Sequence, residues 1–246
     1  MNTVLLYLTH YLKTNYLQIY KNLLRPNQIE IESLKKVESE YFIQKIEFFT
    51  IFDVFYPKSL LLCKNVPMVF FYKGDLSILE KYSKVYLVNE IQNVQTEEIL
   101  NDVILKKKKN CAFVFCGYKQ ERKLEEKLKA NNCKIIYFCA SGLDQINHLE
   151  KDNPNYFFIS AFPIKTHPKK EYFYINNFVA AAFANSLIFI SSEKESKANN
   201  LINCFLNLGK EIYCFPAQNL EDGNNELIKS GANLITKIEE AIKNNP

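Results

Sequence analysis

YCFPAQNLEDGNNELIKSGANLI, residues 213–235, is the stretch that decides the fold of this chain. An apolar run, Ile212–Phe215, is typical of a buried strand, and a short helical pattern follows after a polar loop. Three of the chain's six glycines, Gly209, Gly223 and Gly231, lie in or just before this stretch. In a chain so poor in glycine, each should mark a backbone position with positive φ or a close approach of two backbones.

Upstream of this stretch, short apolar runs alternate with helical patterns. The expected strands are Val85–Val88, Cys111–Phe115, Lys134–Cys139, Tyr156–Ile159, Leu187–Ile190 and Glu211–Phe215. The expected helices are Thr96–Lys107, Gln120–Ala130, Asn176–Ala184 and Ala198–Leu208. Wholly apolar strands that alternate with helices favour a parallel sheet covered on both faces. With right-handed crossovers, this pattern predicts an α/β fold with a Rossmann-like, doubly wound, mostly parallel sheet.

The N-terminal part has a different pattern. Leucines and isoleucines recur at helical spacings through residues 2–45, and Pro26 interrupts them. Strand-like runs follow at Phe48–Phe52 and Met68–Tyr72. We therefore expect a small helical N-terminal element at residues 1–46 and a Rossmann-like domain at residues 47–246.

Composition sets limits on compartment and partners. Lys and Arg number 31 and Asp and Glu 27, so the net charge of +4 is compatible with a polyanionic partner without requiring one. The seven cysteines form no C-x-x-C pair, which favours buried free thiols in a reducing cytoplasm. The N-terminus lacks signal-peptide features, and no apolar run approaches the roughly 18 residues that span a membrane.

Motifs for catalysis, metals and cofactors are missing. The histidines His10, His148 and His167 are isolated and lack metal-ligand spacing. At the end of the first strand of the predicted parallel sheet, where a phosphate loop would lie, the chain reads Val88-Asn89-Glu90-Ile91, without glycine. Glu90 would repel a phosphate there. The sequence therefore predicts no metal and no cofactor, and it argues against a nucleotide-dependent enzyme.

Two segments suggest an anion-binding edge. Gly117 follows the second of these strands and precedes Lys119 and Arg122, and a glycine at this position is where such sheets bind anions. A simple tight turn is the alternative. A basic loop after the fourth strand holds Lys165, Lys169 and Lys170.

Tyr172, Phe173 and Tyr174 follow that basic loop. Lysines interleaved with aromatic rings suit single-stranded nucleic acid, and core packing of the aromatic rings is the alternative. The run Lys106–Lys109 closes a predicted helix, where cations complement the helix dipole, so it is interpreted as structural.

Taken together, ordered blocks over residues 48–240 resemble the DNA-processing protein A family. The similar blocks are Tyr56-Pro57-Lys58-Ser59-Leu60, Gly74-Asp75-Leu76, Cys116-Gly117, Ser141-Gly142-Leu143-Asp144, Phe173–Ala184, Gly209–Ala217 and Gly223–Ala232. Each block alone is weak evidence, and their order along the chain makes coincidence an unsatisfactory explanation.

The resemblance implies a function. It implies a cytoplasmic homodimer that is not an enzyme, binds single-stranded DNA in a basic pocket of a Rossmann-like domain and passes it to a RecA-type recombinase during natural transformation. The positions expected to contact DNA are Gly117, Lys119, Arg122, Lys165, Lys169, Lys170, Asn177 and Lys197.

The chain also departs from the family pattern, mostly where arginines would hold DNA. Asn89-Glu90-Ile91 replaces a Gly-Ser/Thr-Arg block, and Asn177 stands between Asn176 and Phe178 in place of two arginines. Ser196-Lys197-Ala198 replaces a Ser-Gly-Ser turn, Ala161 replaces a glutamate, and no winged-helix extension precedes the end at Pro246. Since Lys or Asn only partly replaces a bidentate arginine, we expect weakened binding with a shallower salt dependence.

Two other hypotheses remain. A degenerate scaffold of this family could act through protein–protein contacts without binding DNA, because the packing blocks persist while the pocket blocks are eroded. An enzyme related to the Rossmann-like nucleoside-monophosphate hydrolases is the third hypothesis, and the missing glycine and acidic phosphate-site motifs argue against it.

Overall fold

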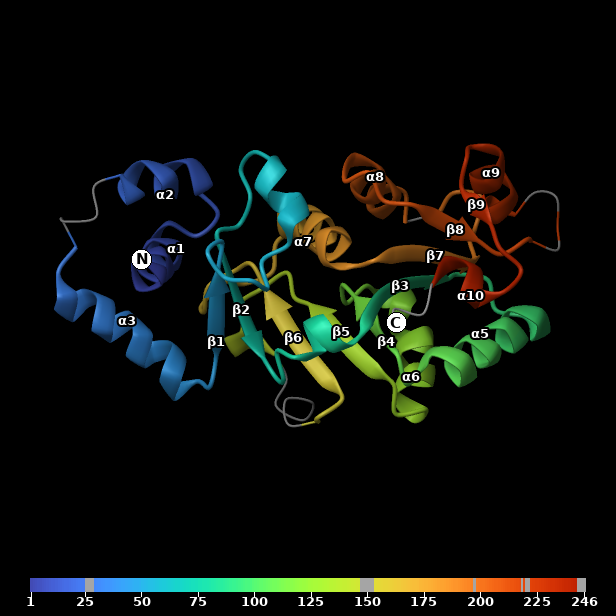
Figure 1. Cartoon of the computed structure of the whole chain (residues 1–246), viewed down its shortest axis with the longest axis horizontal. Helices are drawn as coiled ribbons and strands as arrows, with labels where there is room; N and C mark the ends of the chain where they lie inside the picture. Colours follow the sequence, from blue (N-terminus) through green and yellow to red (C-terminus); the bar gives the residue numbers. More distant parts are fainter. Residues whose placement is uncertain (25–28, 147–152, 197, 218, 220–221, 243–246) are drawn as a thin grey trace. The chain divides into compact units, whose positions relative to one another are not determined.

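A computed structural model describes residues 1–24, 29–146, 153–196, 198–217, 219 and 222–242 (Figure 1). Internal contacts divide the chain into two compact units. The first contains Met1–Leu76 and Phe138–Asn176, and the second contains Ser77–Tyr137 and Asn177–Pro246. These two units differ from the two parts expected from the sequence, residues 1–46 and 47–246, and that expected boundary stays a prediction.

The second unit contains the parallel sheet. Its described strands are β3 (Ser83–Asn89), β4 (Cys111–Phe115), β5 (Lys134–Phe138), β7 (Ser186–Ser191), β8 (Ile212–Cys214) and β9 (Asn233–Leu234). They lie in the order β5-β4-β3-β7-β8-β9 and every pair is parallel. The chain therefore winds outward from β3 in one direction and then from β7 in the other, which is the predicted doubly wound, Rossmann-like topology.

Helices cover both faces of this sheet. They are α4 (Ile78–Lys81), α5 (Val94–Lys107), η3 (Lys119–Glu121), α6 (Arg122–Ala130), α8 (Asn199–Asn207), α9 (Gly223–Lys229) and α10 (Ile238–Ala241). Figure 1 shows α5 and α6 on one side of the sheet and α8 and α9 on the other. The strands between them are buried on both faces, and all five residues of β4 are at most 1% exposed. This explains why β4 is apolar throughout and does not alternate with polar residues.

The first unit combines helices with antiparallel strands. Its elements are α1 (Asn2–Leu12), α2 (Tyr16–Leu23), α3 (Ile31–Ile43), β1 (Glu47–Thr50), η2 (Lys58–Leu62), β2 (Val69–Lys73), η4 (Leu143–Gln145) and β6 (Tyr156–Ser160). β2 pairs with β1 on one side and with β6 on the other, both antiparallel. The ring of Tyr41 on α3 stacks on Phe71 of β2 with centroids 5.0 Å apart. The N-terminal helices are confirmed, and the predicted interruption at Pro26 lies outside the described residues.

Helix α7 (Lys170–Phe183) begins six residues before its predicted start at Asn176. The aromatic residues Tyr172–Tyr174 are therefore helical and not part of a loop. The division between the two units falls within this helix, after Asn176.

The stretch 213–235 has a structural role at the ends of β7 and β8. The Asn224 side chain is fully buried, and its Nδ2 donates to the carbonyl oxygens of Phe215 at 2.8 Å and Ile190 at 3.1 Å. Its Oδ1 accepts from the Ser192 hydroxyl at 2.7 Å. A Cβ on Gly223 would lie 2.3 Å from the carbonyl oxygen of Glu193, so only glycine fits. Asn224 and Gly223 thus join the loops that follow two neighbouring strands.

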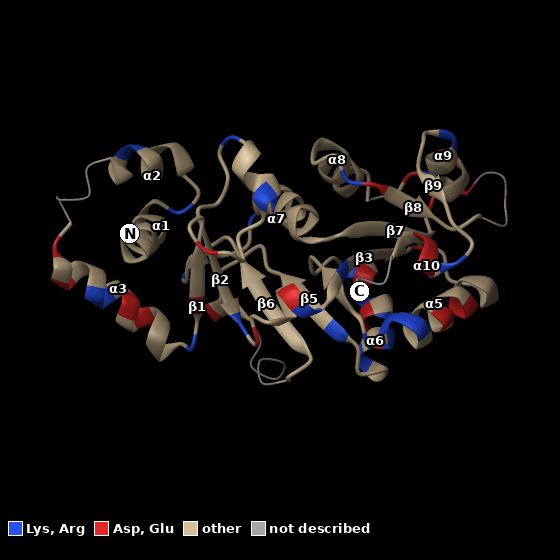
Figure 2. Ribbon diagram, viewed as in Figure 1, with Lys and Arg blue, Asp and Glu red and all other residues tan. Residues whose placement is uncertain are grey.

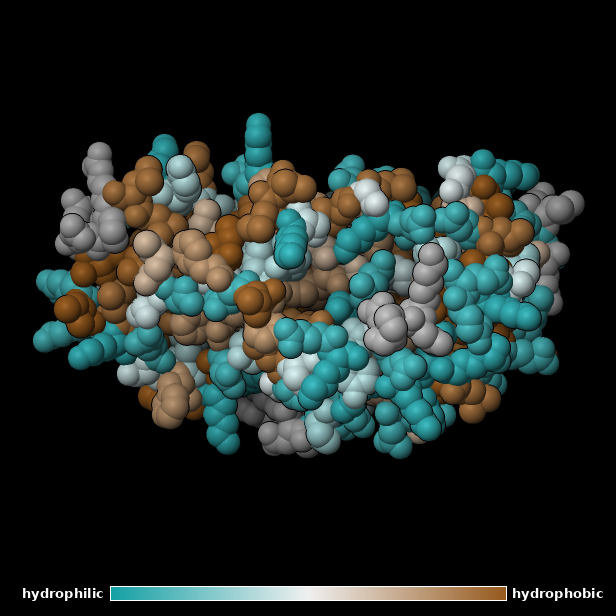
Figure 3. All heavy atoms as spheres, in the orientation of Figure 1, coloured by the Kyte–Doolittle hydropathy of each residue, from teal (hydrophilic) through white to brown (hydrophobic). Residues whose placement is uncertain are grey.

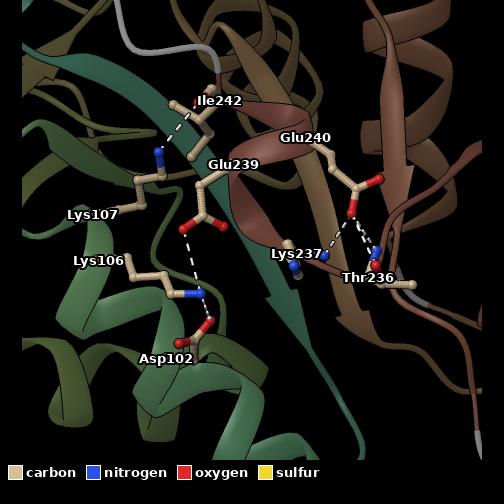
Figure 4. Close-up of polar contacts among 8 residues, drawn as sticks. All are labelled: Asp102, Lys106, Lys107, Thr236, Lys237, Glu239, Glu240 and Ile242. Atoms are coloured by element: carbon tan, nitrogen blue, oxygen red, sulfur yellow. Dashed lines mark hydrogen bonds and ion pairs between the residues drawn. The ribbon is translucent and has the colours of Figure 1, made fainter.

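The lysine run at the end of α5 holds the C-terminal segment (Figure 4). Lys106 lies 2.8 Å from Asp102 on its own helix and 3.4 Å from Glu239 on α10. Lys107 is 2% exposed and donates to the carbonyl oxygen of Ile242 at 3.2 Å. The structural interpretation is confirmed for Lys106 and Lys107.

The cysteines are free thiols, and all but Cys63 and Cys139, which are half-buried, are buried. Within the described residues, no helix has both the length and the apolar character needed to cross a membrane.

Candidate nucleic-acid interface

The carboxyl ends of β3 and β7 form the point at which the strand order reverses. Sheets of this topology bind ligands in the crevice at that point. In the second unit a small pocket lies there, lined among others by Tyr86, Glu90, Tyr118, Glu121, Asn177 and Leu201. Its volume of about 30 Å³ admits roughly two water molecules. We call it the switch-point pocket.

Glu121 occupies the floor of this pocket. Its Oε2 accepts hydrogen bonds from the backbone N–H of Tyr118 at 2.8 Å and of Cys116 at 3.2 Å. Its Oε1 accepts from the hydroxyl of Tyr86 on β3. Burial raises the pKa of the Glu121 carboxyl to about 7, although these hydrogen bonds favour the ionised form.

Gly117 makes this arrangement possible. Its φ is +76°, in the left-handed region that favours glycine, and it turns the chain between the end of β4 and η3. Consecutive backbone N–H groups in such a turn form a concavity that binds anions. The prediction of an anion-binding turn at Gly117 thus has a concrete counterpart, and the anion in it is the chain's own carboxylate.

Glu90 plays a similar part beside β7. One of its oxygens accepts from the backbone N–H of Glu193 at 2.9 Å, and the other accepts from the Ser196 hydroxyl at 3.0 Å. Within the described part of the chain, neither Glu90 nor Glu121 forms an ion pair with a Lys or Arg. The sequence identified Glu90 as a residue that repels phosphate, and the structure adds that it occupies donors a phosphate would need.

Asn177 is the predicted site residue that the structure brings next to the Gly117 turn. Its Oδ1 accepts from the Tyr118 hydroxyl at 2.8 Å, and its Nδ2 donates to Asn200 at 2.9 Å. The residue is 5% exposed. Its amide is therefore already engaged at both ends within the second unit.

Lys119 begins η3, Arg122 begins α6, and both are exposed. Among the described residues, neither takes part in an ion pair. Figure 2 shows that acidic and basic residues are mixed along α5 and α6, so these two helices do not form a uniformly basic region. Lys197, the remaining predicted position of this unit, lies outside the described residues.

The other three predicted lysines belong to the first unit. The ammonium group of Lys165 lies 2.8 Å from the carboxylate of Glu40, and this hydrogen bond lowers the pKa of Glu40. Lys169 and Lys170 are exposed and, within the described residues, form no ion pair. We call residues 165–170 the basic segment.

Aromatic residues beside the basic segment divide between core and surface. The ring of Tyr172 is stacked on Phe162 with centroids 4.4 Å apart and is 8% exposed. The ammonium group of Lys169 lies 5.8 Å from the centroid of the Tyr172 ring. Tyr174 is 58% exposed. Core packing thus accounts for Tyr172, whereas Tyr174 offers a surface on which a base could stack.

The structure also bears on metal binding. Within the described residues, no three His, Cys, Asp or Glu side chains gather in a way that could hold a metal ion.

Sequence reasoning missed the roles of Glu121, Tyr86 and Tyr118. The available signal was an acid directly before a helix and four residues after a glycine at a strand end.

Comparison of sequences adds two findings. A sequence model described as "DNA recombination-mediator protein A" matches residues 149–246. A protein named DNA processing protein DprA from Streptococcus pneumoniae is 24% identical over 212 residues, which is 81% of this chain and 74% of that protein.

Two solved structures share the fold. The X-ray structure of DNA processing protein A from S. pneumoniae has a TM-score of 0.68 at 23% sequence identity. The alignment covers 91% of this chain and 81% of the S. pneumoniae chain. A structure of DNA processing protein A from Helicobacter pylori, described for its single-stranded DNA binding mode, has a TM-score of 0.63 at 19% sequence identity. The alignment covers 79% of this chain and 93% of the H. pylori chain.

Proposed function

We propose that this chain, which is similar to the DNA-processing protein A family in sequence and fold, is a DNA-processing protein of that family and binds single-stranded DNA. It acts in DNA uptake and recombination, in the cytoplasm and as a homodimer, and passes the DNA to a RecA-type recombinase. It does this by binding and transfer, without catalysing a reaction and without a cofactor.

Lys169 and Lys170 carry this proposal. Both are exposed and, in the described part of the chain, lack an acidic partner, so each is available to a phosphate. Tyr174 is exposed one helical turn later, and a ring beside cations is the combination that binds single strands without sequence preference. Lys119 and Arg122 are the cations that the second unit offers.

The proposed binding is weak, for reasons that lie in the second unit. Asn177 has its amide engaged by Tyr118 and Asn200. Two carboxylates, Glu90 and Glu121, occupy backbone and hydroxyl donors at the strand ends. Affinity therefore rests on a small number of exposed cations, so the salt dependence of binding should be shallow, because the slope grows with the number of phosphate contacts.

The test is fluorescence anisotropy with a labelled oligothymidine titrated against salt. A Lys169→Ala/Lys170→Ala variant should reduce the slope of log K against log salt by about 1.4, because each lost phosphate contact on a single strand accounts for about 0.7. Lys108→Ala/Lys109→Ala removes the same charge from the end of α5 and should leave the slope unchanged. No binding by the native chain at low salt contradicts the proposed function, and equal slopes for the two double variants contradict this site.

A degenerate scaffold remains the second candidate, and exposed apolar side chains favour it. Figure 3 shows apolar atoms at the surface over the N-terminal helices. Phe42 and Ile43 at the end of α3 are 85% and 77% exposed. A stable dimer, or retention of a purified RecA-type recombinase on the immobilised chain, without any DNA affinity would favour the scaffold over the first candidate.

A further inference from the structure

We propose that Glu121 is an internal substitute for a phosphate, which keeps the DNA backbone out of the switch-point pocket. This inference rests on the proposed function, because it states which part of the chain a bound single strand cannot use. It makes Glu121 a specificity-determining residue. The pocket accepts uncharged groups only, and the phosphates of a bound strand contact the exposed Lys and Arg side chains instead.

The backbone donors at the end of β4 are already satisfied. The N–H groups of Cys116 and Tyr118 lie 3.2 Å and 2.8 Å from the same oxygen of Glu121. These are ordinary hydrogen-bond lengths, and a phosphate oxygen would need the same positions. Binding of Glu121 and binding of a phosphate are therefore mutually exclusive at this turn.

The internal carboxylate is also favoured by proximity. Glu121 follows Gly117 by four residues, so its side chain reaches the turn without loss of translational freedom. The Tyr86 hydroxyl fixes its second oxygen from β3. A free phosphate must displace a group that is held from two sides.

Charge acts in the same direction. Glu90 adds a second carboxylate to the lining of the pocket, and neither acid has a Lys or Arg partner among the described residues. Above pH 7, where Glu121 is ionised, the two negative charges in this partly buried site repel a phosphate, because the local dielectric constant is lower than that of water.

The inference is tested with inorganic phosphate as the probe. Amide resonances of Cys116, Gly117 and Tyr118 are followed by NMR in the full chain at pH 8. At this pH the Glu121 carboxyl is ionised. The titratable groups that face it are Tyr86, Cys116 and Tyr118. In a Glu121→Ala variant these resonances should shift saturably with phosphate. In the native chain they should not shift.

Glu126→Ala is the matched control, because it removes one exposed carboxylate from α6, the helix that begins directly after Glu121. It should behave like the native chain. Saturable shifts in the native chain, or none in a folded Glu121→Ala variant, overturn the inference.

Glu121→Gln keeps the shape and an acceptor oxygen and removes only the negative charge, so it tests the repulsion alone and serves if the alanine variant does not fold. It should raise affinity for labelled oligothymidine at least threefold at low salt, and Glu126→Gln should not. An equal effect of the two variants overturns the inference. A native chain that binds no DNA, together with phosphate binding by Glu121→Ala, contradicts the proposed function alone.

Discussion

The switch-point pocket of the second unit and the basic segment of the first unit treat anions in opposite ways. The pocket is preorganised, with backbone N–H groups turned toward one point by Gly117, and its anion is the chain's own Glu121. The basic segment carries Lys169 and Lys170 at the surface, without acidic partners among the described residues. Attraction for phosphate is thus retained where side chains are exposed, and it is cancelled where the backbone is best arranged to supply it.

The difference teaches that a fold and its ligand site have separate physical requirements. Strand ends, glycine turns and helix starts are needed for packing, and they create anion-binding geometry as a by-product. One acidic side chain at the right position satisfies that geometry internally. The same backbone can then persist while its ligand specificity changes.

The largest expected effect comes from Asn224→Ala, which breaks the hydrogen bonds that join the loops after β7 and β8. The buried amide donates to the carbonyl oxygens of Ile190 and Phe215, and these would lose their partner in a site that water does not reach. We expect the free energy of unfolding to fall by about 3 kcal/mol. Urea denaturation measures it. Asn225→Ala, which removes an exposed hydrogen bond to Asn219, should cost less than about 1 kcal/mol, and equal costs would contradict the role given to Asn224.

A second prediction concerns the pH dependence of stability. The folded-state pKa of Glu121 is raised to about 7, so the folded chain holds this proton more tightly than the unfolded chain does. Stability from this group is therefore present below its unfolded pKa and is lost as pH rises from about 4.5 to about 7. Relative to Glu121→Gln, the native chain should lose about 2 kcal/mol between pH 5 and pH 8. If the free energy of unfolding changed with pH in the same way for the two proteins, a raised pKa of the buried Glu121 carboxyl would be ruled out.

The sequence predicted the sheet well because burial on both faces leaves a direct trace in composition. Apolar runs such as Cys111–Phe115 need no tertiary information to be recognised. Helix α7 was placed too late, since its first turns carry the consecutive aromatic residues Tyr172, Phe173 and Tyr174, which have low helix propensity and are more typical of strands. Its start at Lys170 depends on packing of Tyr172 against Phe162, which lies ten residues away.

The candidate site was harder to predict for a physical reason. Gly117 was identified from its place at a strand end and Asn177 from the family resemblance, and the structure does bring Asn177 beside the turn through Tyr118. The role of Glu121 depends on which way its side chain folds, and an acid at the start of a helix is ordinarily explained by the helix dipole. Residue type shows which groups are available, and only the fold shows which of them are already bound.

A third prediction separates structural lysines from DNA-binding lysines. Lys107→Met keeps the buried stem of the side chain and removes the donor to the carbonyl oxygen of Ile242. We expect a loss of about 1–2 kcal/mol in the free energy of unfolding, with no change in the salt slope of DNA binding. Lys109→Met at the exposed end of the same run should be neutral in both measurements. A change in salt slope for Lys107→Met would contradict its assignment as a structural residue.

The smallest effect concerns Lys165, the one lysine of the basic segment that has an acidic partner among the described residues. Its ion pair with Glu40 is exposed, and such pairs contribute at most about 1 kcal/mol to stability. A paired ammonium group releases fewer counterions from DNA than a free one. Lys165→Ala should therefore reduce the salt slope by less than the 0.7 or so expected for a full phosphate contact.

Glu40→Gln makes the converse change. It frees Lys165 and removes a negative charge beside the basic segment, so the salt slope should steepen by up to about 0.7. Glu32→Gln removes an exposed charge from the first turn of the same helix and serves as the control. If both variants steepen the slope equally, general charge and not the pairing of Lys165 governs binding. If only Glu40→Gln does so, internal acids limit DNA affinity in the first unit as we propose for the second, and the two regions differ only in how completely their anion sites are filled.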